Sequence, residues 1–247
     1  MFAESVVQKV SRMIEAGVDF IDLGGYSSRP GADDISVDGE QQRVVPILRA
    51  LRQSFPDLPI SIDTFRSEVA RRCLDQGAAM INDISAGYLD VHMLPVIAEY
   101  QVPYCMMHMR GTPQTMQMQT QYDDMIQEIN YYFSERISYA RSLGIHDLLI
   151  DPGFGFAKTV SQNFELLQKL EHLQLAELPV LVGLSRKSMI YKTLDTSAEE
   201  ALNGTTALHM VALQKGASVL RVHDVKEAVE CCRLFQALST TNKSTLA

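Results

Sequence analysis

The strongest constraint on the fold is a pattern that repeats along the whole sequence: a short apolar run, a small polar loop, and a longer stretch with helical spacing. Apolar, β-branched runs predict strands at 18–23, 59–63, 80–84, 104–107, 148–150, 180–184 and 219–222. Helical stretches at 40–55, 67–76, 123–143, 163–173, 199–215 and 225–238 lie between or after them. This alternation is typical of a parallel sheet covered by helices, because parallel strands need crossover connections.

The 247 residues suffice for one α/β barrel or for two ordinary domains. No linker rich in Pro, Gly or Ser and no change of composition divides the chain, which favours a single barrel domain over 1–238 and a polar tail over 239–247. About eight βα units predict a TIM (β/α)8 barrel, with a doubly wound sheet as the alternative. Four glycines support these boundaries, since each follows a helix where a left-handed cap favours glycine: Gly17, Gly77, Gly144 and Gly216.

The strand count is one short of a complete barrel. The sequence opens in an amphipathic segment in which Val6, Val10 and Ile14 have helical spacing, with no strand pattern before it. We therefore expect a barrel that lacks its first strand and loop in this chain, or else an incomplete barrel.

Composition and charge exclude several classes of protein. Hydrophobic residues make up 46% and charged residues 21%, so a folded globular core is expected. The net charge of -8 disfavours nucleic acid as a partner, and any bound anion requires a local cluster of cations. Four cysteines without CxxC spacing, no long apolar run and no secretory signal predict a cytoplasmic protein without a membrane span.

Polar side chains end three of the predicted strands. Asp63, Asn82 and Asp151 occupy these places, and in a barrel the carboxyl ends of all strands face one mouth. A single aspartate there is commonly a helix cap or an ion-pair partner, but three in succession indicate a polar ligand with many donors and acceptors. For His108 and Arg110, in MMHMRGTP, a structural or loop-ordering role is the better prediction.

Basic and hydroxyl side chains follow other strands. The loop 22–31 combines paired glycines with serines and an arginine, and Arg186 and Lys187 follow a later strand. Arg221 and His223 are two residues apart and so share a face, which predicts an anion clamp with the first loop. The alternative for this pair is a buried salt bridge to a neighbouring carboxylate. We expect six side chains to line one cavity, with the acids toward one end and the bases toward the other: Asp63, Asn82, Asp151, Lys187, Arg221 and His223.

Seven segments in order carry a resemblance to a known family: FIDLGGYSSRPGA, PISIDTFR, GAAMINDIS, MMHMRGTP, LLIDPGFGFAK, LVGLSRKSMI and LRVHDV. Together they make the sequence similar to the dihydropteroate synthases of the pterin-binding enzyme family. The resemblance implies a transferase of folate biosynthesis that condenses (7,8-dihydropterin-6-yl)methyl diphosphate with 4-aminobenzoate to give 7,8-dihydropteroate and diphosphate. It also implies a TIM barrel, Mg2+ at the diphosphate, a homodimer formed through the outer helices, and a sulfonamide target.

The resemblance assigns roles to particular residues. It implies that the pterin is held by Asp63, Asn82, Asp151 and Lys187, the diphosphate by Ser28, Arg221 and His223, and the aminobenzoate by Arg29, Pro30, Phe156 and Ser188. Lys187, Arg221 and His223 are the implied catalytic residues. Two positions depart from the family: Ser28 stands where threonine is common, and Tyr26 where glutamate is frequent.

A third departure concerns the beginning of the sequence. Family members begin with a strand and a loop that supplies an asparagine to the metal, and this sequence has neither, so we expect no metal ligand within this chain. We also predict that the chain binds pterin but turns over poorly. Two other functions remain as alternatives: a methyltransferase that passes a methyl group from a methylated folate to a corrinoid protein, and a non-enzymatic pterin-binding protein. The cations at 187, 221 and 223 disfavour the methyltransferase, because no diphosphate leaves in that reaction.

Overall fold

A computed structural model describes residues 2–27 and 34–244 of the chain. Within these residues all seven predicted strands are present: β1 (Ile21–Gly24), β2 (Ile60–Asp63), β3 (Met80–Asp83), β4 (Tyr104–Met107), β5 (Leu148–Asp151), β6 (Leu181–Val182) and β7 (Val219–Leu220). Most of their apolar side chains are buried, with Ile60, Ile62 and Ile81 at 0% exposure. Each such side chain stabilises the fold by about 1.5–3 kcal/mol relative to leaving it in water.

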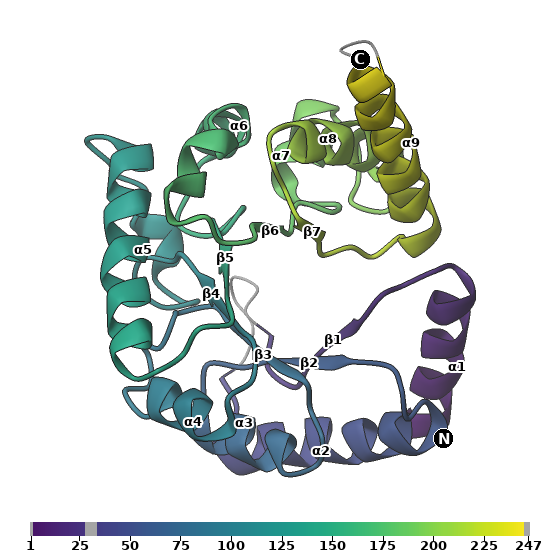
Figure 1. The fold of residues 1–247 in the computed structure, drawn as a ribbon, viewed down its shortest axis with the longest axis vertical. Helices are drawn as coiled ribbons and strands as arrows, with labels where there is room; N and C mark the ends of the chain where they lie inside the picture. Colours follow the sequence, from purple (N-terminus) through teal and green to yellow (C-terminus); the bar gives the residue numbers. More distant parts are fainter. Residues whose placement is uncertain (1, 28–33, 245–247) are drawn as a thin grey trace.

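The strands run parallel and follow one another in sequence order. β1 to β5 form one sheet, β6 pairs with β7, and a bridge between Ile150 and Val180 connects the two sheets. A doubly wound sheet reverses its strand order at a switch point, and no reversal occurs here. The helices lie outside the curved sheet (Figure 1), so the predicted α/β barrel fold is confirmed.

Helices connect the strands and cover their outer face. Their bounds are α1 (Phe2–Glu15), α2 (Val37–Ser54), α3 (Ser67–Leu74), α4 (Met93–Tyr100), α5 (Met125–Ser142), α6 (Val160–Gln168), α7 (Ser188–Thr193), α8 (Leu202–Gln214) and α9 (Val225–Ser244), with 3-10 turns η1 (Met116–Met118) and η2 (Leu170–Ala176). The four glycines predicted as caps all have φ between 79° and 95°, as expected. Among the described residues, no helix is long and apolar enough to cross a bilayer.

The last helix is longer than predicted. It was expected over 225–238, whereas α9 continues through Ser244. The hydroxyls of Ser239 and Thr240 donate to the carbonyls of Phe235 and Gln236, one turn earlier, at 3.0 and 2.6 Å. These side chains bond within the helix, so their polarity does not end it.

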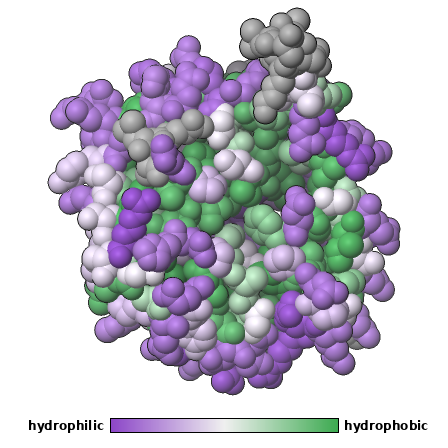
Figure 2. Space-filling view, in the orientation of Figure 1, coloured by the Kyte–Doolittle hydropathy of each residue, from purple (hydrophilic) through white to green (hydrophobic). Residues whose placement is uncertain are grey.

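A cavity separates the first and last strands. No hydrogen-bonded pairing joins β7 to β1 within 2–27 and 34–244, and a cavity of about 580 Å³ lies there. Its wall includes Met13 of α1, Leu220 of β7 and Cys232 of α9. Hydrophobic residues gather around a hollow near the middle of the face in Figure 2, while hydrophilic residues occupy most of its rim. This cavity reaches the carboxyl ends of the strands.

Candidate functional site

The polar residues that end the strands meet at one edge of the sheet. Asp63 pairs in register with Asn82 of β3, and Asp151 pairs with Met107 of β4. Of the six residues expected to converge, four line the cavity: Asn82, Lys187, Arg221 and His223. Asp63 reaches the cavity through its contact with Arg221. Asp151 reaches it at Gly183, where an added Cβ would lie 4.0 Å from the Asp151 carboxylate.

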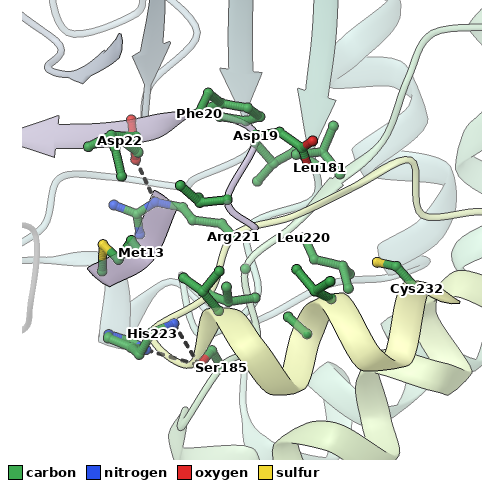
Figure 3. A pocket seen from close by; sticks show the side chains of 18 of the residues that line it. Met13, Asp19, Phe20, Asp22, Leu181, Ser185, Leu220, Arg221, His223 and Cys232 are labelled. Carbon is green, nitrogen blue, oxygen red and sulfur yellow. Dashed lines mark hydrogen bonds and ion pairs between the residues drawn. The ribbon is translucent and has the colours of Figure 1, made fainter. Parts of the chain in front are cut away.

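Arg221 lies between two carboxylates. Its Nε donates to Asp22 Oδ2 at 2.6 Å, the contact drawn in Figure 3, and its Nη2 donates to Asp63 Oδ2 at 2.8 Å. The expected separation of acids and bases at opposite ends is therefore wrong. Burying two carboxylates side by side is costly, and the planar guanidinium offsets that cost by donating to both.

Asp22 is a site residue that the sequence analysis did not single out. Asn82 donates to its Oδ2 at 3.1 Å, and its Oδ1 is buried without a hydrogen-bond partner among the described residues. Such an orphaned acceptor in a cavity fits a ligand N–H group. A signal existed in the sequence, since Asp22 alternates with the apolar Ile21 and Leu23 and so points to the opposite face of the strand.

Burial shifts the ionisation of the site. It raises the pKa of Asp63 to about 7, although Arg221 opposes the shift. It lowers the pKa of Lys187 to about 8, although the nearby Asp151 opposes this. Burial also raises the pKa of Asp151, against the effect of Lys187. Near neutral pH, Asp63 is thus able to act as a hydrogen-bond donor or as an acceptor.

The Asp63 shift predicts a pH dependence of stability. Its pKa rises from 3.8 in the unfolded chain to about 7 in the folded one, so its stabilising contribution is full below 3.8 and is lost as pH rises through 7. Asp63→Asn should remove this loss of stability, so that the free energy of unfolding depends less on pH between 3.8 and about 7. Denaturant unfolding at a series of pH values measures this dependence, and Asp57→Asn, at an exposed position, is the control. An unchanged slope in Asp63→Asn would contradict the shift.

Lys187 connects the loop after β6 to the loop after β5. Its Nζ donates to the carbonyl of Phe154 and lies 4.9 Å from the ring centroid of Phe156. Ser188, the next residue, begins α7. Phe156 and Ser188, predicted to shape the aminobenzoate site, thus lie beside Lys187 in space or in sequence. Three other predicted residues, Ser28, Arg29 and Pro30, lie outside the described residues.

The remaining two basic side chains, His223 and Arg186, have different surroundings. His223 Nδ1 lies 3.0 Å from Ser185 Oγ at the cavity wall, as Figure 3 shows. Arg186 was grouped with the cations of the mouth, but it forms a bidentate ion pair with Asp224, at 2.8 and 2.9 Å. The backbone of Arg186 is in the left-handed region, with φ 53°. Its side chain lies against Asp224 and not beside Lys187. Arg186 therefore holds two loops together.

The predicted Mg2+ has no ready-made protein site in the part of the chain that the structure describes. There, no three His, Cys, Asp or Glu side chains gather closely enough to hold a metal ion. The described residues alone therefore do not form a site for a resident metal ion.

Comparisons with known proteins identify the family to which the chain belongs. A family model described as pterin binding enzyme matches residues 2–223. The dihydropteroate synthase of Escherichia coli K12 is 45% identical over 233 residues, which cover 94% of this chain and 82% of that protein. The chain belongs to the pterin-binding enzyme family. The dihydropteroate synthase of Synechocystis is 44% identical, with 95% of this chain and 82% of that protein covered.

Solved structures of pterin-binding enzymes have the same fold. The dihydropteroate synthase of Yersinia pestis, in complex with a sulfonamide drug, superposes with a TM-score of 0.91 at 41% identity, covering 95% of this chain and 85% of that one. The enzyme of Xanthomonas albilineans with 4-aminobenzoic acid has a TM-score of 0.89 at 40% identity, covering 96% and 85%.

Proposed function

We propose that the chain is a dihydropteroate synthase, which condenses (7,8-dihydropterin-6-yl)methyl diphosphate with 4-aminobenzoate to give 7,8-dihydropteroate and diphosphate. One observation carries the proposal. In a member of the pterin-binding enzyme family, buried carboxylates, an amide and cations converge on one cavity at the carboxyl ends of the strands. The relatives compared above are dihydropteroate synthases, which favours this reaction over methyl transfer.

Recognition of the pterin follows from the chemistry of the buried groups. A pterin presents a guanidine-like edge of N–H donors beside a carbonyl oxygen. Asp63 and Asp151 supply acceptors, Asn82 supplies both an acceptor and a donor, and the Lys187 ammonium donates to the carbonyl. The orphaned Oδ1 of Asp22 is one more acceptor in the same wall. Each of these groups regains in the complex the hydrogen bonds that burial took from it.

The reaction is an alkyl transfer. The C–O bond between the pterin methylene and the diphosphate breaks, and its electron pair leaves with the diphosphate oxygen. The lone pair of the aminobenzoate nitrogen forms the new C–N bond, and that nitrogen then releases a proton to solvent. Arg221 and His223, with Ser28, stabilise the charge on the leaving diphosphate, while the cavity holds the amine in line. To do so, the diphosphate must compete with Asp22 and Asp63 for the guanidinium.

Mg2+ remains the proposed cofactor. When bound, it would supply Lewis-acid chemistry that neutralises charge on the diphosphate. Turnover should fall when Mg2+ is removed with a chelator and return when it is added back. Equal turnover in both conditions would remove Mg2+ from the proposal.

Product formation tests the function directly. Purified chain with both substrates should convert labelled 4-aminobenzoate into dihydropteroate and release one diphosphate for each product. Calorimetry with pyrophosphate alone separates the alternatives, because a methyltransferase has no reason to bind it. The same assay on a chain extended by an N-terminal strand and loop tests the prediction of poor turnover, and equal rates would contradict that prediction.

A homodimer in the cytoplasm completes the proposal. All four cysteines are free thiols, which fits a reducing compartment. Leu234 and Leu238, one turn apart on α9, are 61% and 56% exposed, and an outer apolar strip of this kind fits a subunit contact. Light scattering should give twice the chain mass, and Leu234→Lys with Leu238→Lys should give one chain mass. A monomeric wild type would contradict the dimer.

A further inference from the structure

Lys158 is buried beneath the loop after β5, and its Nζ has three polar neighbours. It is 4% exposed. Its Nζ donates to the carbonyls of Gly153 and Phe156, each at 3.1 Å, and lies 3.1 Å from His108 Nδ1. A lysine is almost never buried this deeply unless specific partners offset the loss of water. These partners are backbone atoms at both ends of one loop and a side chain from the neighbouring strand end.

His108 extends this arrangement to two further loops. It is 2% exposed, and its ring meets the Tyr132 ring edge-on, with 4.8 Å between centroids. The Tyr132 hydroxyl in turn lies 2.9 Å from the carbonyl of Met107 and 3.0 Å from that of Ser85. Lys158 is therefore one end of a buried chain of hydrogen bonds and ring contacts that joins the loops after β3, β4 and β5.

The loop that Lys158 holds forms part of the candidate site. Phe154 offers its carbonyl to Lys187, and the Phe156 ring lies 4.9 Å from the same ammonium group. At the other end of the loop, the Gly153 N–H donates to Asp151 Oδ1 at 2.8 Å. A shift of this loop would move Lys187 and Phe156 together.

We propose that Lys158 is a positioning residue for the arylamine half of the site: it fixes the loop 153–156, and through the loop it sets the places of Phe156 and Lys187. Lys158 itself does not line the cavity. The inference rests on the proposed function because that function identifies the arylamine as the ligand. The contacts between Lys158 and the loop 153–156 are independent of the proposed function.

Steady-state kinetics of Lys158→Met test the inference. Methionine keeps the apolar stem and removes the ammonium group, so the KM for 4-aminobenzoate should rise at least about tenfold, the equivalent of one lost hydrogen bond. The KM for the pterin diphosphate should rise by a smaller factor, because Lys187 is only one of the four groups proposed to hold the pterin. The control is Lys169→Met, whose ammonium pairs with Glu165 at the surface, and which should behave as wild type. Equal rises in both KM values, or no rise, would overturn the proposal.

Amide hydrogen exchange gives a readout that needs no turnover. In Lys158→Met, peptides covering 153–156 should exchange at least about tenfold faster than in the wild type, while peptides from α2 and α8 should not change. Lys158→Gln, which keeps two N–H donors, replaces Lys158→Met if that variant does not fold, with the same direction expected. Unchanged exchange in the loop overturns the inference. A wild type that makes no dihydropteroate overturns the proposed function, while the exchange result still decides the role of Lys158.

Discussion

Asp151→Asn is expected to weaken pterin binding about 100-fold, which corresponds to about 3 kcal/mol, within the range for truncating one partner of a buried, hydrogen-bonded charge pair. Asp151 is 6% exposed at the end of β5, and its charge lies close enough to Lys187 to shift the pKa of both groups. Asparagine keeps the volume and the acceptor for Gly153 N–H but removes the negative charge. The loss of pterin affinity therefore measures the effect of the missing charge and of the missing hydrogen-bond acceptor, and not a change in packing.

The same substitution should change the pH dependence of turnover. Asp151 opposes the burial that lowers the pKa of Lys187 to about 8, so without it that pKa falls further and Lys187 loses its proton at a lower pH. The alkaline limb of the kcat profile should move toward neutral pH. Asp147→Asn, at the exposed opposite end of the same strand, is the matched control. If Asp151→Asn binds pterin as tightly as this control, Asp151 does not contact the pterin.

Arg221→Met should lower kcat by about 10²–10³-fold, the usual cost of removing one preorganised electrostatic stabiliser. Arg221 donates to Asp22 and Asp63 at 2.6 and 2.8 Å, and so it connects the two carboxylates at the cavity wall. Without it, the main group that opposes the effect of burial on Asp63 is gone, and the pKa of Asp63 rises above about 7. The variant should therefore lose diphosphate stabilisation and also keep Asp63 protonated at neutral pH.

Two measurements separate these effects of Arg221. Calorimetry should show that Arg221→Met no longer binds pyrophosphate, and a pH titration should show the raised ionisation of Asp63. Arg71→Met, which removes a surface guanidinium paired with Glu99, serves as the control and should bind pyrophosphate as the wild type does. Normal pyrophosphate binding by Arg221→Met would mean that Arg221 is only a structural partner of the two carboxylates.

Much of the fold was predictable because apolar strands and amphipathic helices are local patterns. All seven strands appear within or beside the expected ranges, since a parallel strand covered on both faces is a continuous apolar run. Two short helices, α4 and α7, were not predicted. α7 has only 6 residues, too few for helical spacing to separate it from a loop, and α4 (MLPVIAEY) contains a proline, which disfavours a helix.

The site was predictable only in part. Asp63, Asn82 and Asp151 stand at strand ends, where the barrel geometry alone brings them to one mouth. The pairing of Arg221 with Asp22 joins residues 199 positions apart, and no local pattern encodes it. The buried position of Lys158 was equally hidden, because a lysine near a loop is ordinarily exposed.

A crystal structure of the chain with 7,8-dihydropteroate tests the central claim most directly. We predict that the pterin ring hydrogen-bonds to Asp63, Asn82 and Asp151, with its guanidine-like edge toward the carboxylates, and that the benzoate ring lies beside Phe156 and Lys187. Product bound at another surface, with these side chains still paired as they are now, would contradict the proposed site.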